Sequence, residues 1–285
     1  MAGEEENKRL FEFERALKTR VVGRPTDGAN EYLASIDSTN NRLAALAREG
    51  APEGTTIIAR EQTAGRGRLG RAWVSAPDSG LYMSTLLRPR KDISELPVIT
   101  LCLGVAARRA VQAVTGLELG LKWVNDLVLN ARKAGGILVE LPVGGKSVAT
   151  GQSDNKALVI GIGINIKHPP GELPEEIAER AIYLEDALGD GTTIDTVELA
   201  AELCYQIESI YKRIEADDQA ILLDEWRAAS VTLGREIKTA SGDLEGTAVD
   251  IDETGALLVK TRDGTGTRIL RAGEISIRSQ DGSYS

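Results

Sequence analysis

The chain has 285 residues, of which 42% are hydrophobic and 27% are charged, a composition typical of a soluble globular protein. Its formal net charge is −9, whereas a dedicated nucleic-acid binder usually has a basic balance or a basic domain. One histidine, His168, and two distant cysteines argue against a structural zinc site and a histidine-based triad. Cys102 and Cys204 fall in predicted helices, so we expect them in the core of a protein from a reducing compartment.

Residues 1–30 are expected to form a partly flexible leader, either as a frayed segment or as a short helix. They are charged at first and then rich in turn residues, among them Gly23, Pro25 and Gly28. They contain no apolar run followed by a cleavage site, so they do not resemble a secretory signal. No stretch of the chain approaches the roughly 18 to 20 apolar residues that span a bilayer. We therefore expect a cytoplasmic location.

Between residues 31 and 230 the apolar pattern predicts one α+β domain, with a sheet of at least five strands covered by helices. The elements expected in chain order are a helix from the N-cap candidates Ser38-Thr39-Asn40 to Gly50, strands at 55–60 and 81–87, a helix from Pro97 to Gly116, strands at 119–123 and 127–129 around an Asn125-Asp126 turn, strands at 136–141 and 157–166 joined by a polar hairpin connection at 142–155, and helices at 197–214 and 220–228.

From Gly234 onward the pattern changes to short alternating strands separated by Gly and Asp turns, which is typical of a small β-barrel. The boundary is expected near residues 229–233. The chain is thus divided into a leader at 1–30, a main domain at 31–230 and a small barrel at 231–285.

Residues 65–71, with the sequence GRGRLGR, are the strongest local feature and are called the Gly/Arg loop below. Residues 60–71 hold four arginines against the single acidic residue Glu61, which suggests a site for a small anion in an acidic protein. Glycines let the backbone approach a ligand, and guanidinium groups grip phosphate through paired hydrogen bonds. Such a loop can fold over a phosphate and become ordered when it binds. The alternative is a solvated basic turn or a weak RNA-binding stretch.

The same segment fits a dinucleotide-binding fingerprint at Gly65, Gly67 and Gly70. That fingerprint must open a helix, whereas residues 72–77 (AWVSAP) are a poor helix start, so we reject a Rossmann site. Gly145-Lys146-Ser147 is also rejected as a phosphate-binding P-loop, because Glu140 stands where that motif needs its first glycine.

Three further clusters are ambiguous by themselves. Lys122-Trp123-Val124-Asn125-Asp126 is either a strand end with a turn or a polar pair that holds water and Mg²⁺ near phosphates. Lys133 is either a solvated lysine or a charge on the sheet face that meets a carboxylate or a phosphoryl oxygen. Gly161 and Gly163 inside a strand indicate either the close approach of a ligand or another backbone, or else a bulge or tight packing.

Taken together, these residues resemble the biotin protein ligase family, whose members are also called biotin–acetyl-CoA-carboxylase ligases. The matching elements run in the family's order: Ser38-Thr39-Asn40, Gln62, GRGRLGR at 65–71 with Trp73, KWVND at 122–126, KAGGILVE at 133–140, GIGIN at 161–165, and GALLVK and GEISIR in the C-terminal part. The chain departs from the family at Val124, where the usual motif has proline. Only about 35 residues precede Ser38, so the resemblance is to members without an N-terminal helix-turn-helix.

The resemblance implies a main domain related to class II aminoacyl-tRNA synthetases, a C-terminal SH3-like barrel, and a biotin site on the sheet. It implies that biotin and biotinyl-AMP are bound by Ser38, Thr39, Asn40, Gln62, Arg66, Gly67, Arg68, Trp73, Lys133, Gly136 and Asn165. Arg68 and Lys133 would be catalytic. Arg71, Asn125 and Asp126 would form the ATP and Mg²⁺ region, with Asp126 as the metal ligand.

The function implied is activation of biotin by ATP to biotinyl-AMP, followed by transfer to a lysine of a biotin carboxyl carrier domain. Thr39 and Gln62 would bind the ureido end of biotin, while Arg68 and Lys133 would neutralise its carboxylate. Expected partners are thus biotin, ATP with Mg²⁺ and the carrier domain, with no DNA, no membrane and a possible homodimer. The rivals are a lipoate or octanoate acyltransferase on the same fold, and a nucleic-acid-binding regulator.

Overall fold

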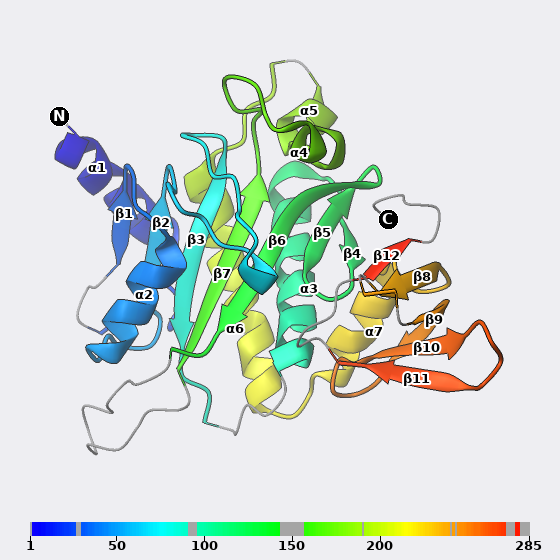
Figure 1. Ribbon diagram of the computed structural model, residues 1–285. Coiled ribbons are helices and arrows are strands. Elements are labelled where there is room, and N and C mark those ends of the chain that lie inside the picture. Colours follow the sequence, from blue (N-terminus) through cyan, green and yellow to red (C-terminus); the bar gives the residue numbers. More distant parts are fainter. Residues whose placement is uncertain are drawn as a thin grey trace.

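In the computed structural model, two β-sheets and the helices around them build the molecule (Figure 1). The structure describes residues 2–26, 30–90, 96–142, 157–189, 191–239, 241–242, 244–271 and 277–279. The elements are α1 (Ala2–Ala16), β1 (Glu31–Leu33), α2 (Thr39–Arg48), β2 (Thr56–Ala59), the 3-10 turn η1 (Arg68–Gly70), β3 (Gly80–Leu87), α3 (Leu96–Thr115), β4 (Gly120–Lys122), β5 (Asp126–Leu129), β6 (Arg132–Glu140), β7 (Leu158–Asn165), α4 (Glu175–Arg180), α5 (Leu184–Leu188), α6 (Thr196–Glu215), α7 (Ala220–Ala229), β8 (Glu236–Thr239), β9 (Glu245–Ile251), β10 (Leu257–Thr261), β11 (Thr267–Leu270) and β12 (Ile277–Ser279).

The main sheet has the strand order β1-β2-β3-β7-β6-β5-β4 among the described strands. Only β1 and β2 pair in parallel, and the other neighbours are antiparallel. The two central strands, β3 and β7, are almost wholly buried, in keeping with their nearly continuous apolar sequences. The predicted hairpin connection at 142–155 and the Gly145-Lys146-Ser147 segment lie almost wholly outside the described residues.

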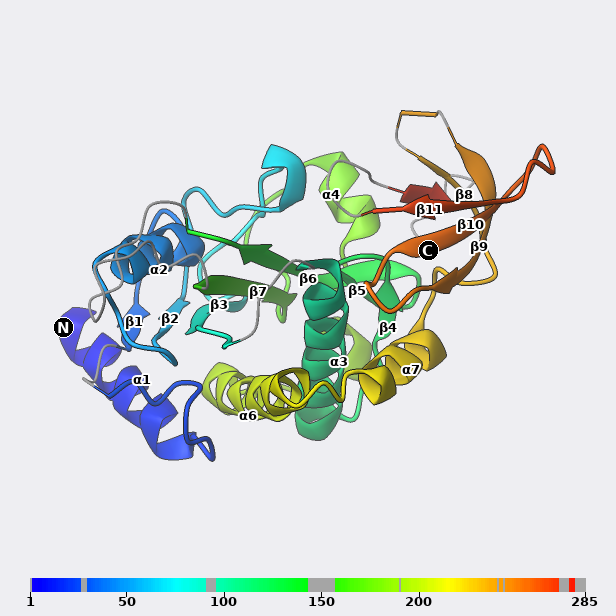
Figure 2. The same cartoon turned by 90° about the horizontal axis from the view of Figure 1, so that it is seen from below.

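One face of this sheet is covered by helices (Figure 2). The long helices α3 and α6 pack on each other and on the sheet, with α1 and α7 at their sides. Helix α3 is long and apolar enough, by length and composition alone, to cross a membrane, contrary to our expectation that no stretch would be. Its buried residues, such as Leu101 and Val105, belong to the main hydrophobic cluster, so it is a core helix.

The opposite face is only partly covered. Helix α2 packs on it through Leu43 and Ala47, which contact Ile57, Leu86 and Val159 of the sheet in a second apolar cluster. Ser38 caps this helix as expected, since its side chain accepts a hydrogen bond from the Asn41 backbone N–H. The remainder of this face carries the cavity described below.

The leader takes the helical form of the two that the sequence allows. Phe13, Leu17 and Val22 bury their side chains in the main cluster, which fixes α1 and the turn after it against α6. Beyond the helix, Glu208 of α6 accepts hydrogen bonds from three successive backbone N–H groups, those of Arg20, Val21 and Val22. The leader is therefore built into the main core.

The second sheet is antiparallel, with the described order β11-β10-β9-β8-β12, and it is strongly curved (Figure 2). Its inward residues, including Ile237, Leu257 and Val259, are part of the same apolar cluster as the main sheet. Trp123 links the two sheets, because its backbone N–H donates to Thr232 Oγ1 and its ring N–H donates to the carbonyl of Gly255. The small all-β region predicted after residue 231 is thus present and is joined directly to the main domain.

The strands and long helices expected from the sequence are present with shifts of a few residues at their ends. The sequence pattern did not predict β1, α4 or α5. Each is short, between three and six residues, so it carries too little periodicity to be recognised. Strand β1 is held by parallel pairing with β2, and α4 and α5 follow the end of β7.

Candidate active site

A cavity of about 410 Å³ lies on the sheet face that carries α2, beneath the Gly/Arg loop. Every site residue predicted from the sequence lines it. These are Ser38, Thr39, Asn40, Gln62, Arg66, Gly67, Arg68, Arg71, Trp73, Asn125, Asp126, Lys133, Gly136 and Asn165. The cavity therefore brings together segments from six separate parts of the main domain, as a single ligand site requires.

The Gly/Arg loop forms a closed hairpin-like excursion between β2 and β3. The backbone N–H of Trp73 donates to the carbonyl of Gly65, and that of Gly67 donates to the carbonyl of Arg71, both at 2.8 Å. At the tip, Leu69 has φ 57° and reverses the chain within η1. No α-helix follows; the chain returns in an extended form to β3, so the rejection of a dinucleotide fingerprint is confirmed.

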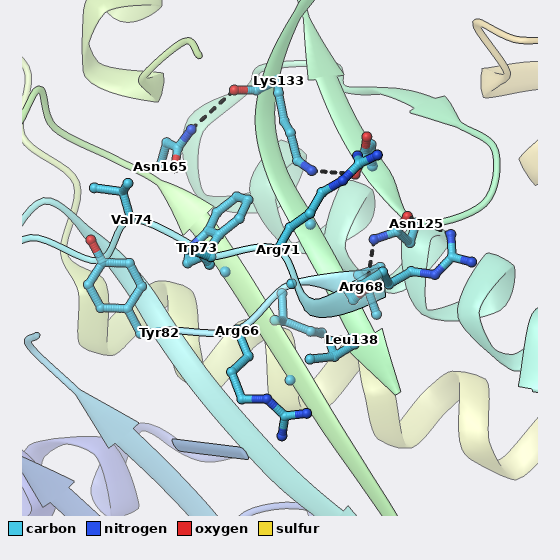
Figure 3. A pocket seen from close by; sticks show the side chains of 18 of the residues that line it. Arg66, Arg68, Arg71, Trp73, Val74, Tyr82, Asn125, Lys133, Leu138 and Asn165 are labelled. Atoms are coloured by element: carbon cyan, nitrogen blue, oxygen red, sulfur yellow. Dashed lines mark hydrogen bonds and ion pairs between the residues drawn. The ribbon is translucent and has the colours of Figure 1, made fainter. Parts of the chain in front are cut away.

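The arginines of the loop diverge. Figure 3 shows Arg66 pointing away from Arg68 and Arg71. Arg66 donates to both carboxylate oxygens of Glu140, with Nη2 2.8 Å from Oε1 and Nη1 3.3 Å from Oε2. Arg68 reaches the opposite wall, where Nη1 lies 3.3 Å from Asn125 Oδ1. Burial lowers the pKa of Arg68, and the nearby Asp126 carboxylate partly opposes that shift.

Trp73 lies flat against the sheet where two glycines leave room for it (Figure 3). A Cβ atom at Gly163 would stand 2.6 Å from Trp73 Nε1, and one at Gly136 would stand 3.5 Å from the ring. The ring N–H is buried and has no hydrogen-bond partner among the described residues. An unsatisfied donor of this kind in a cavity wall is suited to a ligand that brings an acceptor.

Lys133 and Asp126 form an ion pair on the neighbouring strands β6 and β5, with Nζ 2.5 Å from Oδ1. The same ammonium group lies 5.2 Å from the centroid of the Trp73 ring, within the range of a cation–π contact. The lysine that was ambiguous in the sequence is thus on the cavity face of the sheet, together with Arg68 and Asn125.

The other end of the cavity holds a neutral polar network. Gln62 Oε1 accepts from the backbone N–H of Thr39 at 2.8 Å and lies 3.0 Å from its hydroxyl, while Gln62 Nε2 donates to Ser75 Oγ at 2.9 Å. Ser84 Oγ on β3 lies 2.7 Å from Thr39 Oγ1 and 2.6 Å from Asn40 Oδ1. These groups are preorganised donors and acceptors for a polar, uncharged ligand head.

The two glycines of the GIGIN segment, Gly161 and Gly163, make room for side chains that pack on β7. A Cβ at Gly161 would stand 2.1 Å from Asn40 Oδ1, so this glycine admits the Asn40 side chain just as Gly163 admits Trp73. Asn165 at the end of β7 donates to the backbone carbonyls of Lys133 and Ile182 and so braces that end of the cavity. Tight packing against neighbouring side chains, one of the alternatives that the sequence left open, explains both glycines, and the strand has no bulge there.

Sequence reasoning missed several residues of this site. Glu140 belongs to the KAGGILVE segment but was given no role, and Ser84 is a hydroxyl inside the apolar strand LYMSTLL, a signal that could have been noticed. Tyr82, two residues before Ser84 on the same strand, lines the cavity, whereas Ser84 lies behind Thr39 and Asn40. Glu176 and Arg180 of α4 pair at 2.7 Å in the far wall, and no sequence pattern marked them.

The residues present suit a metal that arrives with a phosphate substrate rather than a resident one. No group of three or more His, Cys, Asp or Glu side chains with metal-site spacing occurs in the described part of the chain. Asp126 offers one carboxylate beside Asn125, and Mg²⁺ commonly binds through one or two carboxylates plus substrate phosphates. The predicted role of Asp126 as a ligand fits that mode, although its carboxylate is also the partner of Lys133.

At position 124 the chain has valine where the family motif has proline, and the Trp123–Val124 peptide bond is cis. The turn still presents Asn125 and Asp126 to the cavity. Two hydrogen bonds of 3.0 Å to Ile137 fix Asn125 there. The Asn125 side-chain Nδ2 donates to the backbone carbonyl of Ile137, and the Asn125 backbone carbonyl accepts from the backbone N–H of Ile137.

Comparison with known proteins gives two family matches. Residues 32–165 match the Biotin/lipoate A/B protein ligase family, and residues 232–278 match the Biotin protein ligase C terminal domain. The Bifunctional ligase/repressor BirA of Bacillus subtilis is 32% identical over 250 residues, which cover 87% of this chain and 73% of that relative. The Biotin--[acetyl-CoA-carboxylase] ligase of Mycobacterium tuberculosis is 31% identical over 276 residues, covering 92% and 94%.

Solved structures give the same picture. The biotin protein ligase from Aquifex aeolicus in complex with biotin and ATP superposes with a TM-score of 0.74 at 31% sequence identity, covering 88% of this chain and 99% of that one. The biotin protein ligase from Leishmania major in complex with biotinyl-5-AMP superposes with a TM-score of 0.54 at 26% identity, covering 85% and 98%.

Proposed function

This chain belongs to the biotin protein ligase family, and we infer that it activates biotin with ATP to biotinyl-5'-AMP and transfers the biotinyl group to a lysine of a biotin carboxyl carrier domain. The observation that carries this function is the polarity of one cavity. A neutral hydrogen-bonding network stands at one end, an aromatic ring lies in the middle, and a cluster of cations stands at the other end. Biotin has the same sequence of chemical groups, from ureido ring to apolar chain to carboxylate.

At the neutral end, Thr39 and Gln62 would bind the ureido group, and the buried Ser84 hydroxyl would orient Thr39. Gln62 and Ser84 each place a polar atom within 3.0 Å of the Thr39 hydroxyl, so little rearrangement is needed to receive a ligand of matching donors and acceptors. Trp73 would cover the apolar chain, and its buried ring N–H would find an acceptor on the bound intermediate.

At the charged end, Lys133 and Arg68 would promote the first step. A carboxylate oxygen of biotin attacks the α-phosphorus of ATP, the bond to the bridging oxygen of the β-phosphate breaks, and pyrophosphate leaves. Because an anion approaches an anion, fixed positive charge is the main aid that a protein can give. Asn125 positions Arg68, and Mg²⁺ carried by ATP would neutralise the leaving pyrophosphate, with Asp126 as its protein ligand.

In the second step the neutral amine of a carrier lysine attacks the acyl carbon of the mixed anhydride, and AMP leaves. No residue of the site needs to become acylated, and a nucleophile paired with a base is not required. The Gly/Arg loop would exclude water from the anhydride while the carrier domain approaches. The two buried thiols, Cys102 and Cys204, and the use of ATP favour a cytoplasmic enzyme.

The test is biotin-dependent exchange of pyrophosphate into ATP, with lipoate and octanoate as the competing acids. Biotin should support exchange, and the other two acids should support about a hundredth of it or less. Transfer is then followed by mass spectrometry on a carrier domain, with the same domain carrying Arg in place of the acceptor lysine as control. Exchange with lipoate and none with biotin would refute the assignment.

A further inference from the structure

Glu140 stands at the last position of β6, where the strand leaves the sheet beside the first turn of α2. Its carboxylate accepts hydrogen bonds from Arg66 of the Gly/Arg loop, as described above, and from Asn40 Nδ2 at 3.0 Å. Arg66 Nη1 in turn donates to Asn41 Oδ1 at 2.9 Å. One carboxylate thus joins three separate segments: the loop, helix α2 and the central sheet.

The position of Arg66 separates it from the phosphate end of the cavity. Arg68, Asn125 and the Lys133–Asp126 pair lie together on the other side of the loop (Figure 3). An anion placed on Arg66 would also have to lie beside the Glu140 carboxylate, which repels it. The guanidinium group is already in two-oxygen contact with that carboxylate. Arg66 is therefore poorly placed to grip the phosphate of the intermediate.

We propose that Glu140 is a positioning residue that holds the Gly/Arg loop closed by binding Arg66, so that Arg66 serves as a latch and the phosphate is left to Arg68 and Lys133. This inference rests on the proposed function for its catalytic meaning. It also makes a claim about the protein alone, namely that the Arg66–Glu140 pair keeps the loop on the sheet in the absence of any ligand.

The latch follows from the side-chain contacts that hold the two sides of the loop to the protein. One side of the loop reaches Glu140 and Asn41 through Arg66, and the other side reaches Asn125 through Arg68. Only Gly67 separates the two arginines, and the chain reverses just after Arg68, at Leu69, whose side chain is exposed. Loss of the first tie would free one edge of the loop while the second remained, which should speed opening without removing the phosphate grip.

The first experiment uses the ligand-free full-length protein and limited trypsin digestion, since the loop itself supplies cleavage sites at Arg68 and Arg71. We compare wild type with Glu140→Gln, which keeps the shape of the side chain and removes its charge. Cleavage at the two sites should be about tenfold faster in the variant, because a partly exposed ion pair of this geometry is worth up to ~1.4 kcal/mol. Equal cleavage rates would overturn the latch.

The matched control is Glu31→Gln. Glu31 also makes a two-oxygen ion pair with an arginine, Arg42 of α2, and its side chain is 25% exposed against 28% for Glu140. Its ion pair joins β1 to α2 and does not involve the Gly/Arg loop, so its loss should leave loop cleavage unchanged. If both variants are cut faster, the effect is general loosening of α2 and the proposal fails.

The second experiment measures how long the enzyme keeps the intermediate. Enzyme loaded with radiolabelled biotinyl-AMP is freed of nucleotides, and label release is followed in wild type, Glu140→Gln, Arg66→Met and the double variant. Each single variant should release label about tenfold faster, and the double variant about tenfold rather than a hundredfold, because one pair is lost in all three. Additive effects would show that the two residues act separately and would reject the latch.

Pyrophosphate exchange at saturating biotin separates the two roles of Arg66. A latch predicts that kcat changes to the same extent in Glu140→Gln and Arg66→Met, because both variants lose the same ion pair. A kcat that falls at least about tenfold further in Arg66→Met than in Glu140→Gln would show that Arg66 binds the reacting phosphate and would reject the latch. If wild type forms no biotinyl-AMP, the proposed function fails on its own, and the trypsin result still decides the latch.

Discussion

Lys133 Nζ and Asp126 Oδ1 lie 2.5 Å apart on adjacent strands, so the strongest candidate for the catalytic cation enters the reaction with a carboxylate already beside it. The pair holds the ammonium group on the cavity face, near the Trp73 ring. A phosphate that enters can share Lys133 without forcing a side chain to be reorganised, and this preorganisation is where most electrostatic catalysis arises.

Replacing Lys133 with Met should therefore slow formation of biotinyl-AMP by about a hundred- to a thousandfold, as the loss of one fixed charge from a transition-state site does. The KM for biotin should change by less than about threefold, because the ureido-binding network is at the other end of the cavity. Single-turnover quench-flow with excess enzyme measures both. A variant that lost biotin affinity and kept its rate would show that Lys133 binds rather than catalyses.

Arg68→Gly should release biotinyl-AMP into solution and label nearby protein lysines without selection. Arg68 is half-buried and is predicted to donate hydrogen bonds to the phosphate of the intermediate, and a hydrogen bond to a charged group is worth roughly 1.5–3 kcal/mol. Labelling of added albumin, detected on a blot, should rise by at least about tenfold. Arg68→Ala is the control for backbone freedom: it should leak to a similar extent, and tight retention by the alanine variant would assign the effect to the glycine instead.

Much of the site could be predicted because its residues are consecutive in the chain or belong to short sequence motifs. The N-cap at Ser38, the Gly/Arg loop and the lysine before the glycine pair are all visible as short patterns, and all of them line one cavity. The glycines of β7 could be seen in the sequence too, but the reason why the strand needs glycine at these positions could not. That Gly161 faces Asn40 and Gly163 faces Trp73 depends on strand pairing and on the path of a loop far away in the sequence.

Other features depend on contacts that no local pattern carries. Arg66 and Arg68 are two residues apart and look equivalent in the sequence, yet Arg66 pairs with Glu140 whereas Arg68 donates to Asn125. The leader appeared frayed because its residues are charged, but Phe13 and the acceptor Glu208, almost two hundred residues later, fix it to the core. Tertiary contacts of this kind override local propensity.

Gly163→Ala should disrupt the site by displacing Trp73. The new Cβ would stand 2.6 Å from Nε1 and 2.7 Å from Cε2 of the ring, and real Cβ atoms do not come so close. We expect biotin affinity to fall by about tenfold or more in calorimetry, since the ring can no longer lie on the sheet. Gly104→Ala in α3 is the control, because its nearest neighbour would be 3.5 Å away and alanine favours a helix. Unchanged affinity in the first variant would show that Trp73 has no part in biotin binding.

Ser84→Ala should raise the KM for biotin by about tenfold and leave kcat within about twofold, because it removes a fully buried hydroxyl that orients Thr39 and Asn40. Thr85→Val is the matched control on the same strand. Its hydroxyl pairs with Thr56 Oγ1 at 3.0 Å outside the cavity, so its loss should lower the melting temperature without changing the KM. Equal effects of both variants on KM would mean that Ser84 acts only through the stability of the strand.

Glu208→Gln should destabilise the protein in a pH-dependent way. Burial by itself would raise the pKa of Glu208, but hydrogen bonds from Lys212 and from the backbone N–H groups of Val21, Arg20 and Val22 outweigh it, and the pKa lies below its ordinary value. A carboxylate whose folded pKa is depressed stabilises the fold at pH above its unfolded pKa, and this contribution disappears as the pH falls through the folded pKa. At pH 7 the variant should lose about 2 kcal/mol of unfolding free energy, the cost of losing a charged acceptor.

The measurement is urea unfolding of wild type and variant at a series of pH values from neutral to acid. The difference between the two proteins should be constant above the ordinary glutamate pKa of about 4.3, and it should shrink as the pH falls below that value and through the lower pKa of folded Glu208. Glu202 on the same helix accepts a side-chain hydrogen bond from Gln206 alone among the described residues, so Glu202→Gln should give a small difference with little dependence on pH. A Glu208→Gln difference that stayed constant down to pH ~3 would mean that shape, and not charge, holds the leader to α6.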